Sequence, residues 1–238
     1  EADYTFEIVY SDPAGNPAMS YNTEFTIDKT DPEFTVAYNN NSCKNEDQFN
    51  QNRIATITIK EHNFSSNGVE FTINDEKVSG DELKWSSGGD TDTHTAEVPF
   101  TEEANYEVSF SCVDLAGRQN KAVDYGESVA PEKFTIDKTA PTNMQINING
   151  ESVLSADETT VLFNKFYNER VEIELGADCG VSGKESFQYQ KVSEESSYSE
   201  NNEWEVYDET KGIIVDPNEK FIIYFRAEDR AGNVSIVN

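Results

Sequence analysis

The stretch Phe25-Thr26-Ile27-Asp28-Lys29-Thr30-Asp31-Pro32 occurs a second time in the chain, as Phe134-Thr135-Ile136-Asp137-Lys138-Thr139-Ala140-Pro141. Counted from Asp28 to Asp137, the two copies lie 109 residues apart (137 − 28). This spacing matches the length of one β-sandwich domain, which is roughly 100 residues. The 238 residues are therefore expected to hold domains of one kind in tandem.

A turn motif, Asp-x-Ala-Gly followed by Asn or Arg, occurs three times, at residues 12–16, 114–118 and 229–233. Its glycine provides the positive φ that a tight turn between strands needs. Before each copy, side chains at every second position are apolar or small, which is typical of a strand with one face on a core. These positions are Tyr4, Phe6, Ile8 and Tyr10; Tyr106, Val108, Phe110 and Cys112; and Phe221, Ile223, Phe225 and Ala227.

The pattern predicts an all-β fold of tandem immunoglobulin-like β-sandwich domains. Residues 1–30 are expected to hold only the last hairpin of one repeat, strands F and G. Residues 31–138 are expected to form a whole domain, and residues 139–238 another that lacks a clear last strand. Expected strands lie at residues 34–38, 53–60, 69–73, 94–100 and 133–137, and again at 144–148, 170–175, 187–192, 204–207 and 221–227.

Tyr4 and Tyr106 stand where an immunoglobulin-like domain has its tyrosine corner, at the start of strand F. A true immunoglobulin has a cysteine two residues later, but Phe6 and Val108 stand there, so no disulfide is expected between the sheets. The chain has three cysteines. The sequence leaves open whether Cys43 reaches Cys112.

The chain carries 18 basic and 46 acidic residues, a net charge of −28. Such an excess of acid disfavours nucleic acid and anionic membrane surfaces as partners. No apolar run approaches the roughly 18 residues of a membrane span, so no membrane insertion is expected. Carboxylates suit Ca²⁺, which takes oxygen ligands. A merely solvated acidic surface is the alternative.

In the predicted topology, the linker that enters a domain lies beside two of its loops. This would gather Asp28, Asp31, Glu61 and Asp114 at the first linker, and Asp137, Asp178 and Asp229 at the second. Each group is a candidate Ca²⁺ site. In the alternative, each turn aspartate bonds its own backbone while Lys29 and Lys138 neutralise the linkers.

Residues of an active site are not recognisable in this sequence. Gly-x-Ser-x-Gly is absent, and the two histidines, His62 and His94, are too few for a histidine-based metal site. Acid pairs such as Glu102 with Glu103 are so common that choosing a glycosidase pair would be arbitrary. We therefore expect no enzymatic activity in this segment.

The chain resembles the bacterial Ig-like domains that recur in Gram-positive cell-surface proteins. The resemblance rests on the Ile-Asp-Lys-Thr-x-Pro junctions, the Asp-x-Ala-Gly-Asn turns and the segment 53–64. Arg118 departs from it, because it replaces the asparagine that ends the turn. The resemblance implies a secreted, often wall-anchored protein in which such modules serve as stalks or adhesive segments. In related repeats of large adhesins, calcium between the domains makes the array rigid.

Two other functions remain open at this stage. One is a module that binds an extracellular glycan or host protein, for which Trp85, Trp204 and Tyr207 are the candidate platform. The other is an accessory region of a secreted glycan-degrading enzyme. Residues 1–30 also suggest strand exchange with another copy, in addition to contacts with neighbouring Ig-like repeats.

Overall fold

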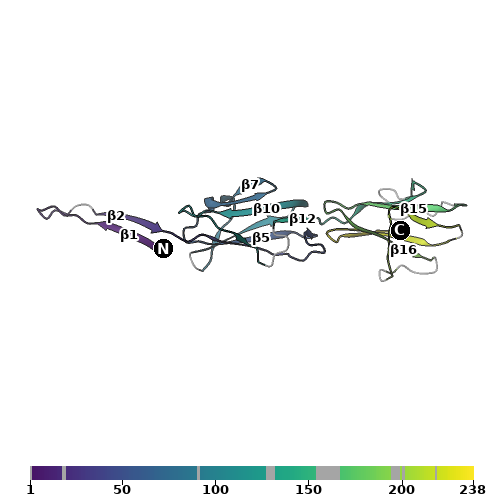
Figure 1. Cartoon of the computed structure of the whole chain (residues 1–238), viewed down its shortest axis with the longest axis horizontal. Coiled ribbons are helices and arrows are strands. Elements are labelled where there is room, and N and C mark those ends of the chain that lie inside the picture. The colour runs from purple at the N-terminus through teal and green to yellow at the C-terminus, as the bar shows by residue number, and fades with distance from the viewer. Residues whose placement is uncertain are drawn as a thin grey trace. The chain divides into compact units, whose positions relative to one another are not determined.

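The computed structural model describes residues 2–17, 20–89, 92–126, 132–153, 167–193, 199, 202–217 and 219–238. These residues form twenty β-strands, two short 3₁₀ turns, η1 (Ser66–Gly68) and η2 (Gly80–Glu82), and no α-helix (Figure 1). The expected all-β class is therefore confirmed. By its contacts the chain divides into two compact units: residues 1–39, 54–98 and 108–128, and residues 40–53, 99–107 and 129–238. The domain boundaries expected from the sequence stay a prediction.

The strands form five sheets. The first is a hairpin of β1 (Ala2–Ile8) and β2 (Tyr21–Ile27). The second has the order β4 (Gln48–Phe49), β12 (Lys133–Ile136), β10 (Ala104–Cys112), β6 (Val69–Ile73), β7 (Glu76–Ser79). The third has the order β11 (Val123–Asp124), β3 (Glu33–Tyr38), β5 (Arg53–Lys60), β9 (Thr93–Phe100), β8 (Ser86–Ser87).

The last two sheets have four strands each. One has the order β14 (Glu151–Ser152), β13 (Thr142–Ile148), β15 (Val171–Asp178), β18 (Ile213–Val215). The other has the order β17 (Glu205–Val206), β16 (Lys184–Val192), β19 (Ile222–Asp229), β20 (Val234–Val237). The sequence pattern offered no clear last strand here, but β20 pairs antiparallel with β19.

The cores arise from strands that bury every second side chain. In β5 the buried positions alternate with half-buried threonines and Ile54, so that Ala55, Ile57 and Ile59 face inward. Phe34 of β3 lies 6.1 Å from Phe110 of β10, ring centre to ring centre, which brings two sheets face to face. A second core joins strands of the two four-stranded sheets through Ile146, Ile173, Leu175, Phe187, Tyr207, Ile213, Phe225 and Val237.

The hairpin β1–β2 repeats the pairing of β10–β12. Tyr4 stands opposite Phe25, and Tyr106 stands opposite Phe134. The rings of each pair stack with centroids 5.2 Å apart. The neighbouring pairs match as well, because Thr26 donates a hydrogen bond to Asp3 and Thr135 donates one to Asn105. The two hairpins are therefore equivalent, as the sequence repeat predicted.

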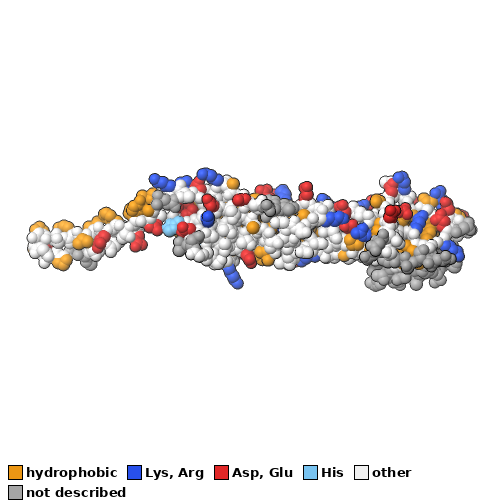
Figure 2. Space-filling model, turned by 90° about the horizontal axis from the view of Figure 1, so that it is seen from below, with side chains coloured by type: hydrophobic (Ala, Val, Ile, Leu, Met, Phe, Trp, Pro, Cys, Tyr) orange, Lys and Arg blue, Asp and Glu red, His pale blue; other side chains and the backbone are white. Residues whose placement is uncertain are grey.

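The two hairpins differ in what covers them. Phe134 is 2% exposed and packs edge-on against Phe49 and Phe100, whereas Phe25 is 50% exposed. Apolar side chains are exposed all along β1 and β2 (Figure 2). Tyr106 donates its hydroxyl proton to the carbonyl of Glu102 at 2.9 Å, a bond to upstream backbone of the kind that was expected for this tyrosine.

All three cysteines are free, so Cys43 and Cys112 do not form a disulfide. Cys112 is fully buried on β10, and burial raises the pKa of its thiol to about 12. A thiol with so high a pKa is a weak nucleophile at neutral pH. Cys112 therefore acts as a small apolar residue of the core.

Candidate metal centre

Three carboxylates meet beside the linker that joins β2 to β3. Asp28 directly follows β2, Glu61 directly follows β5, and Asp114 opens the turn after β10. One oxygen of each carboxylate lies within 4.8 Å of the other two. Glu61 and Asp114 are buried, and Asp28 is half-buried. The structure thus brings together three of the four residues that the sequence predicted for this site.

Asn63 connects two of these carboxylates. Its side-chain amide donates to Oδ2 of Asp28 at 2.9 Å, and its backbone N–H donates to Oε1 of Glu61 at 2.7 Å. The backbone N–H of Thr30 donates to Oδ1 of Asp28 at 2.9 Å, so Asp28 also forms the expected Asx-type turn. These bonds fix the positions of Asp28 and Glu61 relative to the loop after β5.

One oxygen of Asp114 accepts a hydrogen bond, and the other has no partner among the described residues. Its Oδ1 accepts the backbone N–H of Arg118 at 2.9 Å. Its Oδ2 is buried and accepts no hydrogen bond from any described residue. An unpaired buried acceptor costs roughly 1–3 kcal/mol, and a charged one costs more. This oxygen can therefore gain a partner, and a cation is the partner that neighbouring carboxylates favour.

The donor set fits a hard cation. Three carboxylates bring a formal charge of −3, and Ca²⁺ binds six to eight oxygens at about 2.3–2.6 Å. Without a cation the three carboxylates repel one another, because like charges at this separation interact unfavourably, and a divalent cation between them replaces that repulsion by attraction. The three side chains would supply part of the coordination shell, and carbonyl oxygens or water would supply the rest.

Asp31, the fourth residue predicted for this site, has other partners. It accepts ion pairs from Nη2 of Arg118 at 2.5 Å and from Nζ of Lys121 at 2.8 Å. The hydrogen bond from Lys121 and the one from Arg118 lower the pKa of Asp31. Asp31 is therefore occupied by cationic side chains and is not part of the cluster.

Asp137, Asp178 and Asp229 do not form a cluster of this kind among the described residues. Asp137 is fully buried, and its Oδ2 accepts both the backbone N–H of Ser182 at 2.8 Å and its hydroxyl at 2.7 Å. Asp178 is exposed and accepts the N–H of Gly180 at 3.1 Å. Hydrogen bonds within the protein thus satisfy this second group.

Asp229 is fully buried, and both of its oxygens have partners. Oδ1 accepts the backbone N–H of Asn233 at 2.8 Å, and Oδ2 accepts its side-chain amide at 2.9 Å. Burial is the main cause that raises the pKa of Asp229, and the charge of Asp137 adds to the rise. Both the burial and the nearby carboxylate of Asp137 therefore disfavour the charged form of Asp229.

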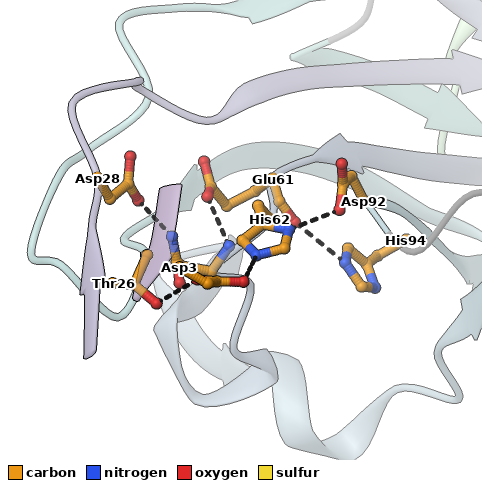
Figure 3. Close-up of polar contacts among 8 residues, drawn as sticks. Asp3, Thr26, Asp28, Glu61, His62, Asp92 and His94 are labelled. Carbon is orange, nitrogen blue, oxygen red and sulfur yellow. Dashed lines mark hydrogen bonds and ion pairs between the residues drawn. The ribbon is translucent and has the colours of Figure 1, made fainter. Parts of the chain in front are cut away.

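His62 is a residue of this region that the sequence did not identify as functional. Its Nδ1 lies 2.9 Å from Oδ1 of Asp92, and its Nε2 lies 2.9 Å from Oδ2 of Asp3, so the ring bridges two carboxylates (Figure 3). The hydrogen bonds with Asp92 and Asp3 raise the pKa of His62 to about 9. No local pattern could have predicted the bridge, because its partners lie 30 and 59 residues away in the chain.

Of the aromatic residues considered as a glycan platform, Tyr207 is buried, whereas Trp85 and Trp204 are half-buried. Nε1 of Trp85 donates to the carbonyl of Gly80 at 2.8 Å, and its ring meets Phe64 edge to face. Tyr207 is 8% exposed, and its hydroxyl accepts the backbone N–H of Leu175 at 3.1 Å. Both residues therefore stabilise local structure.

No family model matches the chain, and no curated protein matches it. Within the described residues, no helix is long and apolar enough to pass through a lipid bilayer.

Proposed function

We propose that this chain is a non-catalytic segment of a secreted or wall-anchored bacterial surface protein, in which tandem Ig-like domains serve as a stalk or adhesive module. The observation that carries the proposal is the equivalence of β1–β2 and β10–β12. Their residues pair in the same register, and both hairpins are followed by the same Ile-Asp-Lys-Thr linker. A unit repeated with its linker is typical of an array that spans distance.

The proposed place of this array is extracellular and associated with the cell wall, and the charge of the chain suits an array of separate modules. A net charge of −28 keeps such an array soluble and disfavours collapse of one module onto another. Trp85 is half-buried against Phe64 and Tyr207 is buried, so these two rings do not favour the glycan-binding alternative. The ligand of an adhesive module would therefore be bound elsewhere than at these two rings.

We further propose that Ca²⁺ binds at Asp28, Glu61 and Asp114. The ion would tie the linker after β2 to the loop after β5 and to the turn after β10. The unpaired Oδ2 of Asp114 supports this proposal most directly, because hydrogen bonding leaves that oxygen without a partner among the described residues. A linker held to two loops would hold its flanking strands in fixed positions, which is what a stalk requires.

Thermal unfolding of the chain with and without Ca²⁺ tests the cation site. A ligand at 100 times its Kd stabilises the native state by about 2.7 kcal/mol, which raises the melting temperature by several degrees. Extracellular calcium modules bind Ca²⁺ with a Kd of about 0.1–1 mM, so we expect about 1–2 kcal/mol of stabilisation, and a rise of a few degrees, for the native chain in about 5 mM CaCl2. NaCl at equal ionic strength is the control for general charge screening.

Asp114→Asn is the matched variant, since it keeps the size of the side chain and removes its charge. We expect D114N to remain folded and to lose most of the calcium-dependent rise. An equal rise in the variant, or no rise in the native chain, would reject the site.

The surface location is tested on intact cells of the source organism. An antibody against the chain should label unbroken cells, and added protease should remove the label. If the protein is found only after the cells are lysed, the stalk or adhesive role is wrong.

A further inference from the structure

The three copies of the Asp-x-Ala-Gly turn have the same backbone conformation, but the side chains that bond the aspartate differ. In each copy the backbone N–H of the glycine donates to the carbonyl of the aspartate, at 2.9 Å in the first copy and at 3.1 Å in the other two. The glycines have φ of 84°, 82° and 89°, for Gly15, Gly117 and Gly232. Because the backbones agree, any difference between the copies comes from their side chains.

In the first and third copies, an asparagine closes the turn. Nδ2 of Asn16 donates to Oδ2 of Asp12 at 2.7 Å, and Nδ2 of Asn233 donates to Oδ2 of Asp229 at 2.9 Å. The backbone N–H of the same asparagine bonds the other oxygen, at 2.9 Å and 2.8 Å. The asparagine thus satisfies both oxygens of its aspartate.

The second copy has Arg118 in place of the asparagine. Its backbone N–H still donates to Oδ1 of Asp114 at 2.9 Å, but its guanidinium pairs with Asp31. Oδ2 of Asp114 then has no described donor, although Asp114 is only 5% exposed. The Asp114 carboxylate lies beside those of Asp28 and Glu61, each with an oxygen within 4.8 Å.

We propose that the residue at the end of this turn selects whether a linker binds a cation. An asparagine at this position bonds both oxygens of the aspartate, so that the linker needs no cation. Arg118 bonds only Oδ1 of Asp114 and leaves Oδ2 available to a divalent cation. This inference rests on the proposed calcium site and adds the residue that controls it. Arg118 is a positioning residue here and would not bind the cation itself. Its guanidinium pairs with Asp31 and donates no hydrogen bond to Oδ2 of Asp114.

The linker after β12 illustrates the closed state. Asn233 bonds both oxygens of Asp229 and also donates from Nδ2 to the carbonyl of Asp137 at 2.8 Å. Ser182 donates two hydrogen bonds to Oδ2 of Asp137, from its backbone N–H and from its hydroxyl. One chain should therefore bind one divalent cation at its linkers, at the first and not at the second.

The test compares Arg118→Asn with Arg118→Ala in calcium calorimetry on the full chain. R118N supplies the amide that Asn16 and Asn233 supply in the other turns, while R118A removes the same charge and the same ion pair to Asp31 without supplying a donor. We expect one site in the native chain, similar or tighter binding in R118A, and binding at least about tenfold weaker in R118N.

Melting without calcium shows that the variants are folded and gives a second reading. Since R118N pairs an oxygen that is otherwise unpaired, we expect it to melt at a higher temperature than R118A in EDTA. Binding by R118N as tight as in the native chain would overturn the selector role and leave the calcium site standing. Equal loss in both variants, or two cations per chain, would also overturn it. Absence of binding in the native chain would reject the calcium site itself.

Discussion

At the scale of single residues, position in the fold gives chemically identical side chains different roles. Arg53 begins β5 and Arg170 directly precedes β15, and each stands four residues after a phenylalanine in the sequence. Arg53 is fully buried, with its guanidinium carbon 4.0 Å from the ring centre of Phe49 and 4.6 Å from that of Phe134. Arg170 is exposed, and its Nε lies 3.5 Å from Oδ1 of Asp216.

We predict that Arg53→Ala lowers the free energy of unfolding by about 3–5 kcal/mol. The change leaves a cavity against two rings and removes the donor of the carbonyl of Asn40, which Nε bonds at 3.0 Å. Arg170→Ala, the matched control, should cost no more than about 1 kcal/mol, because exposed ion pairs contribute little. Denaturant unfolding of the sandwich core measures both, and equal effects would contradict the assignment.

His62 provides the pH dependence of the region beside the linker. Its folded pKa of about 9 lies above the ordinary value of 6.5, because Asp92 and Asp3 stabilise the charged ring. Its contribution to stability is therefore fully present below about pH 6.5 and is lost as the pH rises through about 9. We predict that a proton NMR titration in EDTA gives His62 a midpoint near 9, and that Asp3→Asn lowers it. A midpoint near 6.5 would show that the bridge does not form in solution.

At the scale of elements, period-two alternation predicted the strands that pack on a core. The expected ranges 53–60 and 69–73 coincide with β5 and β6, because each buries alternate side chains. The two-residue strands β4, β8, β11 and β14 were not predicted, since pairs so short carry no period. The pairing of β4 with β12 is parallel and joins residues far apart in the chain, so only the tertiary structure specifies it.

The candidate site was predictable to the extent that topology determines which loops lie together. Asp28, Glu61 and Asp114 follow the ends of strands that the sequence identified, so their meeting could be anticipated. Asp31 could not be assigned, because its partners depend on which way Arg118 and Lys121 point. Asp178 failed to join Asp137 and Asp229 because its side chain is exposed and serves its own turn.

The two equivalent hairpins allow one substitution to be made in two environments. Phe134→Ala should cost about 3–5 kcal/mol, because the ring packs between Phe49, Phe100 and Tyr106 in the core. Phe25→Ala should change the stability of the sandwich by no more than about 0.5 kcal/mol, because the ring is half exposed. Unfolding followed by tryptophan fluorescence measures both changes, and equal losses would show that the aromatic face of β1–β2 is part of a core.

At the scale of the whole molecule, the account combines a strongly acidic chain with repeated hairpins, turns and linkers. Self-repulsion of so many carboxylates weakens the folded state at low ionic strength, and any added salt relieves part of it. A specific divalent site differs from this general effect because it saturates and depends on particular carboxylates. A dependence on particular carboxylates would therefore show that a cation binds at the linker after β2, whereas general salt only screens its charges.

Diffraction from crystals grown with CaCl2 tests the central claim most directly, through the anomalous signal of the ion. The account predicts one strong peak bounded by oxygens of Asp28, Glu61 and Asp114, at about 2.3–2.6 Å from each ligating oxygen, and no peak among Asp137, Asp178 and Asp229. Empty density between the first three carboxylates in millimolar calcium, with Oδ2 of Asp114 bonded to a protein donor or to water alone, would contradict it.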